Sequence, residues 1–138
     1  MGFKFNPTTG TLDLVGEKAT SVKSLTDKKL ATQTVSALQI IYFNNSNECS
    51  LSDNSSYAQA VSAGMALNAA NSGEEVNILV SGTYQDASFF YALNEPLFLG
   101  TNGSIQTTQP ASGSYLTQVG FGLGVGSIYI RIGNPKSL

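Results

Sequence analysis

The sequence predicts an all-β protein, a small β-barrel or sandwich with an extended N-terminal arm, and three observations support this prediction. Short apolar stretches recur about every 8 to 12 residues from residue 37 onward, a spacing typical of small sandwiches and barrels. Many of them are rich in β-branched and aromatic side chains, which favour strands. Asn, Ser and Gly gather between them, where turns are expected. At 138 residues the chain has room for one such domain.

The first 16 residues alternate apolar and polar side chains on either side of a Pro-containing turn, and we expect them to form a docking arm. The candidate partner-binding residues of this arm are Phe3, Phe5, Asn6, Pro7, Leu12 and Leu14. Burying each large apolar side chain contributes about 1.5 to 3 kcal/mol, but ordering the backbone costs about 1 to 2 kcal/mol per residue. The arm is therefore expected to become ordered on the sheet edge of a partner, by β-augmentation. In the alternative, Phe3 and Phe5 fold back onto the chain's own barrel.

Residues 17–36 carry most of the charge and few large apolar groups. This composition predicts a solvated linker between the arm, residues 1–16, and a β domain over residues 37–138. A helical turn near Ser24 to Leu30 is an option within the linker.

Strands are expected wherever an apolar stretch is bounded by turn residues. In order, they are predicted at residues 37–43, 48–52, 60–67, 74–84, 95–100, 103–108, 116–124 and 127–133. The stretch 55–73 is the exception, because its alanines also favour a helix over part of its length. Gly64 and the apolar residues around it suit a strand that ends at Asn68, with a turn after it.

Two turns between the predicted strands are specified by their residues. Asn102-Gly103 lies between apolar stretches, and this pair is the strongest short hairpin signal because a type I′ turn needs positive φ at both central positions. The glycines of the last reversal are Gly122, Gly124 and Gly126. Glycine permits sharp bends and a close approach of the backbone there.

Alternation is clearest in the last predicted strand. Successive residues of a strand face opposite sides of the sheet. Ile128, Ile130 and Ile132 therefore share one face, and Tyr129 and Arg131 share the other.

Charge and hydropathy disfavour several classes of function. Charged residues make up 12% of the chain, and no basic residue lies between Ala31 and Ile130, where six acids stand. Nucleic-acid binding needs a cluster of cations, so no nucleic-acid partner is expected. The sequence contains no apolar run of about 18 residues and starts with no apolar signal segment, so we expect neither a membrane span nor a signal peptide.

The side chains that most enzymes use are missing. The chain has no His, so Ser-His and Cys-His nucleophiles are excluded. Its one cysteine, Cys49, excludes an intramolecular disulfide and a multi-cysteine metal site, and we expect a buried thiol. Glu74 and Glu75 are adjacent and face opposite sides of a strand, and Asp86 and Glu95 could meet only through a loop. We therefore expect no enzyme activity, no catalytic residue, no cofactor and no bound metal.

A group of aromatic residues lies at the end of the strand predicted at 74–84 and just after it. Its members are Tyr84, Phe89, Phe90 and Tyr91. We expect them to pack in the core or to form an oligomer interface, where aromatic side chains are enriched. Binding of a ligand is the alternative.

About half of the chain carries a recognisable pattern. Residues 62–132 contain a small-residue strand, an apolar strand that ends in Ser-Gly-Thr-Tyr (81–84), an acidic loop, "PLFLG", and then "VGFGLGVGSIYI". In this order they resemble a domain of tailed-bacteriophage virion proteins, in particular the head decoration (cement) proteins of the lambda type. The start, "FKFNPTTGTLDLVG", separately resembles the beginning of phage tail-fibre or structural proteins. The chain departs from the lambda-type pattern in its longer linker and its more Gly-rich last hairpin.

The resemblance implies a β-tulip-like domain on the outer surface of the capsid of a virion, synthesised in the host cytoplasm. A protein of this kind stabilises the head by clamping neighbouring subunits of the major capsid protein through its arm, and it forms a homotrimer. In the alternative, the chain is a tail or short-fibre protein that is anchored to a tail protein by its N-terminal peptide. Its β domain is then exposed, as a spacer or for binding a host glycan.

Overall fold

The longest strand, β5 (Glu75–Gln85), connects the two halves of the fold because three strands pair with it. The computed structural model describes residues 24–138. β1 (Ser24–Ala31) pairs antiparallel with one edge of β5. The opposite edge is shared, since β4 (Gly64–Ala66) pairs with the first half of β5 and β10 (Ser127–Arg131) pairs with the second half.

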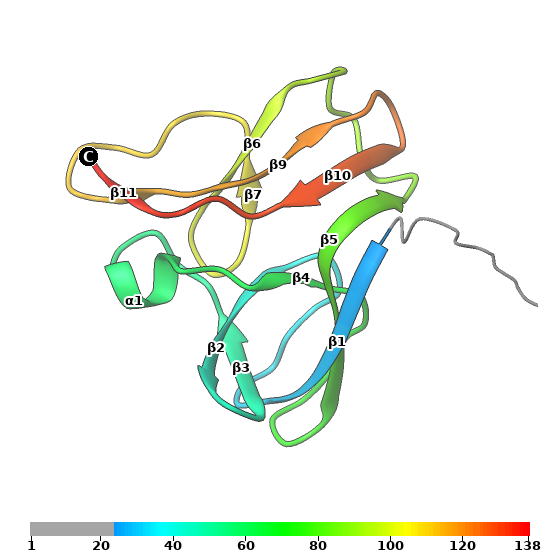
Figure 1. The fold of residues 1–138 in the computed structure, drawn as a ribbon, viewed down its shortest axis with the longest axis vertical. Coiled ribbons are helices and arrows are strands. Elements are labelled where there is room, and N and C mark those ends of the chain that lie inside the picture. Colours follow the sequence, from blue (N-terminus) through cyan, green and yellow to red (C-terminus); the bar gives the residue numbers. More distant parts are fainter. Residues whose placement is uncertain (1–23) are drawn as a thin grey trace, which may run out of the picture.

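Five strands close into a ring on one side of the molecule. The two strands that complete it are β2 (Ile40–Asn45) and β3 (Glu48–Leu51). The order around the ring is β1-β3-β2-β4-β5, and β5 returns to β1. The β1–β3 pair is parallel and the other pairs are antiparallel. Figure 1 shows this ring in the lower half of the view.

The other half is an open sheet that continues from β5 through β10, β9, β6 and β7, and we call β10, β9, β6 and β7 the outer sheet. The new strands are β6 (Pro96–Leu99), β7 (Ile105–Gln106) and β9 (Gln118–Gly122). A separate pair of short strands, β8 (Tyr115–Leu116) and β11 (Lys136–Ser137), and one helical turn, α1 (Tyr57–Ala60), complete the described elements. In Figure 1 the outer sheet lies above the ring.

Two apolar clusters fill the fold, and three strands separate them. The ring cluster contains Ala31, Val35, Ile41, Cys49, Ala66, Ala70, Val76 and Ile78. The sheet cluster contains Ile40, Ala60, Met65, Leu79, Phe89, Leu97, Leu99, Val119, Ile128 and Ile130. Neighbouring residues of β2, β4 and β5 therefore go to opposite clusters, because successive side chains of a strand point to opposite faces. These three strands are buried on both faces at the junction of the two halves.

The all-β class predicted from the sequence is confirmed. The fold combines a ring of strands with an open sheet rather than a single closed barrel. Asn102 and Gly103 have φ values of 50° and 74° and join β6 to β7, as the hairpin prediction requires. Ile128 and Ile130 are fully buried in the sheet cluster, as their alternation indicates.

The predicted linker is wrong in its second half, since residues 24–31 form strand β1 and not a helical turn. Asp27, Lys28 and Lys29 have low strand propensity, and pairing with β5 decides their conformation. Val35 is also buried in the ring cluster, so the folded region begins before residue 37.

Three other predicted strands differ from the structure in their bounds. Residues 60–67 do not form one strand, because the helical turn α1 ends at Ala60 and β4 covers only Gly64–Ala66. The strand predicted at 37–43 begins at Ile40, after Leu38 adopts a φ of 72° that a strand does not allow. The stretch 116–124 is divided, since its first residue belongs to β8 and the remaining strand is β9.

Candidate functional site

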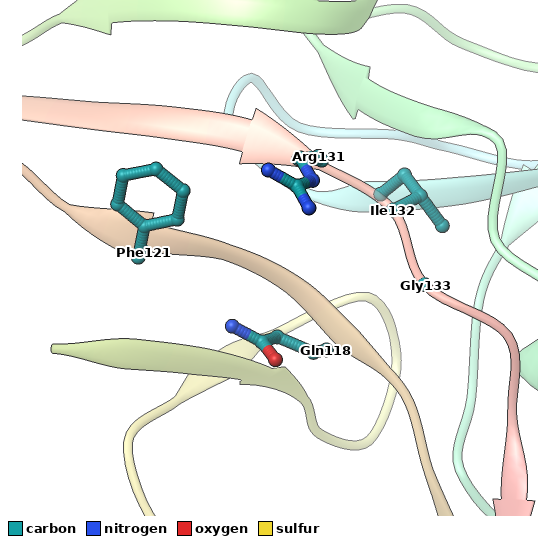
Figure 2. A pocket seen from close by; sticks show the side chains of 5 residues that line it. All are labelled: Gln118, Phe121, Arg131, Ile132 and Gly133. Atoms are coloured by element: carbon teal, nitrogen blue, oxygen red, sulfur yellow. The ribbon is translucent and has the colours of Figure 1, made fainter. Parts of the chain in front are cut away.

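The face of the outer sheet that is turned away from the core contains a hollow of about 280 Å³. Its lining residues are Gln118, Phe121, Arg131, Ile132 and Gly133. Figure 2 shows the side chains of Gln118 and Phe121, carried by β9, and of Arg131, carried by β10, around one space.

A second hollow of about 190 Å³ shares two residues with the first. Its lining residues are Phe98, Leu116, Gln118, Gly133, Asn134 and Lys136. The shared residues are held together, because the backbone N–H of Gly133 donates to the carbonyl of Gln118 at 2.8 Å. The two hollows are therefore adjacent, and we call them together the outer groove.

A β-bulge in β9 shapes this groove. Leu97 of β6 lies opposite Gly120, and the next residue, Phe98, lies opposite Gln118, so Val119 is an extra residue on β9. In a regular strand two residues three positions apart face opposite sides. The bulge changes the alternation, so Val119 stays in the core while Gln118 and Phe121 both line the outer groove.

Phe121, which lines the first hollow, packs against a second aromatic ring. Phe121 and Tyr129 lie opposite each other on β9 and β10, with ring centroids 5.2 Å apart and ring planes at 32°. Both side chains are half-buried. Pairs in this geometry stabilise each other, so the Phe121 ring is held in place at the edge of the hollow.

The groove is positively charged. Arg131 and Lys136 are the only basic residues that follow Lys29 in the sequence, and both line it. Within residues 24–138 the Arg131 guanidinium has neither a hydrogen-bond partner nor an ion-pair partner, and no carboxylate lines either hollow. The Gln118 amide donates one hydrogen bond, from Nε2 to the Gly120 carbonyl at 3.2 Å. These features suit recognition of an anion.

Three side chains that were considered above for catalysis, Cys49, Asp86 and Glu95, make contacts elsewhere within residues 24–138. Cys49 is buried in the ring cluster, and burial raises the pKa of its thiol. Asp86 accepts hydrogen bonds from the hydroxyl and the backbone N–H of Ser88, which lower the pKa of its carboxyl. Glu95 accepts from the backbone N–H of Ala92 at 3.0 Å. Asp86 and Glu95 each stabilise their own turn.

Residues 24–138 were also searched for groups of metal ligands and for membrane-spanning helices. No group of three or more Asp, Glu, Cys or His side chains within residues 24–138 could hold a metal ion. None of the helices over the same range has the length and apolar character needed to span a membrane.

The predicted aromatic group is divided by the fold. Phe89 is buried in the sheet cluster, with its ring 6.5 Å from that of Tyr84 and 6.1 Å from that of Tyr91. Tyr84 and Tyr91 are half-buried and pack against the same cluster. Phe90 alone points outward, with 76% of its surface exposed. Three of the four candidate interface residues therefore pack at the core, and Phe90 stays available for a partner.

Phe90 is one of three exposed apolar side chains that two hydrogen-bonded segments carry, a feature that the sequence did not indicate. Leu93 and Val125 are 66% and 78% exposed, and we call these three side chains the apolar tip. Hydrogen bonds of 2.8 Å fix the loop 86–95 to the β9–β10 hairpin, among them those from Gly126 N–H to the Phe89 carbonyl and from Asn94 N–H to the Gly122 carbonyl. Figure 1 shows this loop and this hairpin side by side at one end of the molecule.

The candidate residues of the arm lie outside the residues that the structure describes. They are Phe3, Phe5, Asn6, Pro7, Leu12 and Leu14. The prediction that they bind a partner stays a prediction. Neither the outer groove nor the apolar tip was predicted from the sequence, although the sequence shows that Arg131 and Lys136 are the basic residues that follow Lys29.

Comparison with known proteins gives a likeness in fold. No protein-family model matches the sequence, and no curated protein matches it. Among solved structures, the chain is similar to the N base of the head fiber protein gp8.5 in bacteriophage phi29, with a TM-score of 0.50 and 14% sequence identity. The similarity covers 78% of this chain and 94% of that chain. The described domain therefore has a fold similar to that of the head-fiber base.

Proposed function

We propose that the chain is a structural protein of a tailed-bacteriophage virion, attached to the outer surface of the head. The likeness in fold to the head-fiber base carries the proposal, because it covers 94% of that domain. The order of sequence features over residues 62–132 supports the same class independently, through its resemblance to head decoration proteins. The groups described in residues 24–138 fit a role in binding rather than catalysis.

Two parts of the chain would attach it to the head, the β domain and the N-terminal arm. The β domain contacts the capsid or a second copy through the apolar tip, since an exposed group of large apolar side chains is typical of a protein contact. The N-terminal arm adds a strand to a sheet edge of the major capsid protein and clamps neighbouring subunits. Assembly as a homotrimer would strengthen attachment, because linked arms bind with a higher effective concentration.

The test is immunogold labelling of the phage particles whose genome encodes the chain, with an antibody raised against residues 24–138. Labelling over the head is expected. Labelling confined to the tail would instead support the tail or short-fibre alternative. A protein that is absent from purified particles would overturn the assignment to a virion.

A second experiment separates a decoration protein from a fiber base. Particles with the full chain, particles without it, and particles with residues 1–16 deleted are compared for loss of DNA on heating. A clamping role predicts that the first kind resists heating best and that the deletion loses most of this resistance. Equal resistance in all three, with the protein still bound to heads, would support a fiber base that does not stabilise the shell.

A further inference from the structure

The outer groove brings together three kinds of recognition group. It offers a guanidinium at Arg131, an aromatic ring at Phe121, and side-chain amides at Gln118 and Asn134. We propose that this groove binds a carboxylated saccharide, a class that includes oligosaccharides of uronic and sialic acids. The proposal rests on the described domain alone and does not depend on the assignment to a virion.

The carboxylate is assigned to Arg131. Guanidinium presents two parallel N–H groups that match the two oxygens of a carboxylate, and such charge-assisted bonds are the strong ones. No acidic partner of Arg131 lies within residues 24–138, so no carboxylate of the described domain competes with a ligand for its guanidinium. Lys136, in the adjacent hollow, adds a second positive charge, and no lining carboxylate opposes it.

The sugar ring is assigned to Phe121. The face of an aromatic ring carries partial negative charge, and the C–H groups on one face of a pyranose carry partial positive charge. Tyr129 supports the Phe121 ring at 5.2 Å, so its orientation is set before a ligand binds. A ring that is held in advance loses little conformational freedom on binding.

The hydroxyl groups are assigned to the two amides. A side-chain amide both donates and accepts hydrogen bonds, which matches neighbouring hydroxyls of a sugar. Within residues 24–138, Nε2 of Gln118 donates one hydrogen bond, to the Gly120 carbonyl, and the amide lines the groove with donor and acceptor capacity that this bond does not use. The bulge at Val119 places this amide on the same face as Phe121.

Size and charge argue against other anions. The first hollow holds about 280 Å³, close to the lower limit of small-molecule sites, which is roughly 300 Å³. The groove is therefore sized for one or two sugar rings. A sulfate or phosphate group presents three oxygens in a tetrahedral arrangement and favours several cations together, whereas the two cations of the groove line different hollows, Arg131 the first and Lys136 the second.

The experiment measures binding of the full chain by isothermal titration calorimetry to four matched probes. They are a uronic acid trisaccharide, a sialylated trisaccharide, a neutral galactose trisaccharide and a sulfated galactose trisaccharide. At least one carboxylated probe is expected to bind, at least about tenfold more tightly than the neutral and sulfated ones, since a charge-assisted hydrogen bond supplies a factor of this size. Failure of both carboxylated probes to bind at millimolar concentration would overturn the proposal.

Three variants locate the site. Arg131→Gln and Phe121→Leu are each expected to weaken binding of the carboxylated probe at least about tenfold. Lys28→Gln removes the same unit of charge from the exposed strand β1, outside the groove, and is expected to leave binding unchanged. Thermal unfolding of each variant checks that it is folded. Unchanged binding by Arg131→Gln, or an equal loss in Lys28→Gln, would show that general charge and not this groove carries the affinity.

An acidic peptide is the competing occupant, because it also carries carboxylates. A tri-glutamate peptide is titrated under the same conditions and is expected to bind more weakly than the carboxylated saccharide, since it has no ring face for Phe121. Tighter binding of the peptide would overturn the choice of a saccharide.

Discussion

Gly103 is required by two separate features of its position. Its φ of 74° lies in the left-handed region that L side chains rarely adopt. A Cβ there would also lie 2.7 Å from the carbonyl oxygen of Ile40. The tip of the β6–β7 hairpin is packed closely against β2, because Gly103 accepts from Ile40 N–H at 2.7 Å and donates to the Ser52 carbonyl at 2.6 Å.

We expect Gly103→Ala to destabilise the protein more than Gly113→Ala. Both glycines have positive φ, so both variants suffer left-handed strain of about 1 to 2 kcal/mol. Only at Gly103 does the added methyl group meet backbone, whereas nothing lies within 4 Å at Gly113. The clash adds about 1 to 3 kcal/mol. Urea unfolding of both variants measures the difference, and equal losses would show that the hairpin tip can move away from β2.

The stability of the fold depends on pH through the carboxyl group of Asp53. Its carboxylate accepts from the backbone N–H of Asn102 and of Ser55, both at 2.9 Å, and so connects the segment before α1 to the hairpin tip. Partial burial raises the pKa of this carboxyl, but the hydrogen bonds outweigh burial and hold the pKa below its ordinary value of 3.8. The carboxylate therefore stabilises the fold above pH 3.8, and this stabilisation is lost as the pH falls through the lower pKa of the folded state.

The variant Asp53→Asn is expected to lose this part of the acid sensitivity. Asp53→Asn should have a lower free energy of unfolding than the original chain at pH 7. This difference in free energy should be smaller at pH 3, where the Asp53 carboxylate of the original chain becomes protonated. Unfolding in urea at both pH values measures it. Glu75→Gln, at an exposed position on β5, is the control for removing one carboxylate. A difference that stays constant between the two pH values would contradict the role given to the Asp53 hydrogen bonds.

Among the strands, β9 depends most on a small residue. A Cβ on Gly120 would lie 1.9 Å from the carbonyl oxygen of Tyr129 on the paired strand β10. Gly120 is also the residue that follows Val119 in the bulge, so it sits where the local twist is greatest. The close approach of β9 and β10 thus depends on the absence of a side chain.

Gly120→Ala is accordingly expected to cost more than about 2 kcal/mol of stability, because the two strands must separate. Gly133→Ala is the matched control, since a Cβ there meets only the Gln118 carbonyl oxygen at an ordinary 3.5 Å. Chemical denaturation followed by circular dichroism measures both. If Gly120→Ala lost no more stability than Gly133→Ala, β9 could move away from β10 without a cost in stability.

Strand β1 could not be predicted from the sequence of its own residues. The sequence Ser-Leu-Thr-Asp-Lys-Lys-Leu-Ala has a polar character typical of linkers, and six of its eight residues are exposed. It is a strand because β5 offers a free edge beside it, a condition that lies about 50 residues away in the chain. Pairing with a strand that is distant in the sequence leaves no pattern in the residues of β1 themselves. The strands with buried isoleucines and the Asn-Gly hairpin were predictable because their signals are local.

The candidate site was less predictable than the fold for a related reason. Gln118 and Phe121 share a face only because of the bulge at Val119, and strict alternation places them on opposite faces. Phe90 and Phe89 lie in an irregular loop, where alternation does not apply, so the sequence could not separate the exposed ring from the buried one. Arg131 was not predicted as a site residue, although it and Lys136 are the basic residues that follow Lys29 in the sequence.

At the scale of the molecule, the two apolar clusters are mechanically coupled. Ile78 and Leu79 are adjacent on β5, yet the first packs in the ring cluster and the second in the sheet cluster. The same division holds for Met65 and Ala66 on β4. Disorder of β4 or β5 would therefore open both clusters together. The ring and the outer sheet are expected to unfold as one unit, although they look like separate halves.

This coupling predicts the behaviour of one core variant in each half. Ile78→Ala and Ile130→Ala each empty a fully buried site and are expected to cost about 2 to 5 kcal/mol. In both variants, Cys49 in the ring cluster and the Phe121–Tyr129 pair on the outer sheet should lose their native environment at the same urea concentration. Thiol labelling of Cys49 and NMR signals of the aromatic pair follow the two halves separately. If Ile130→Ala opened the outer sheet while Cys49 stayed protected, the ring would be an independent unit, and β5 would hold it together without help from β10.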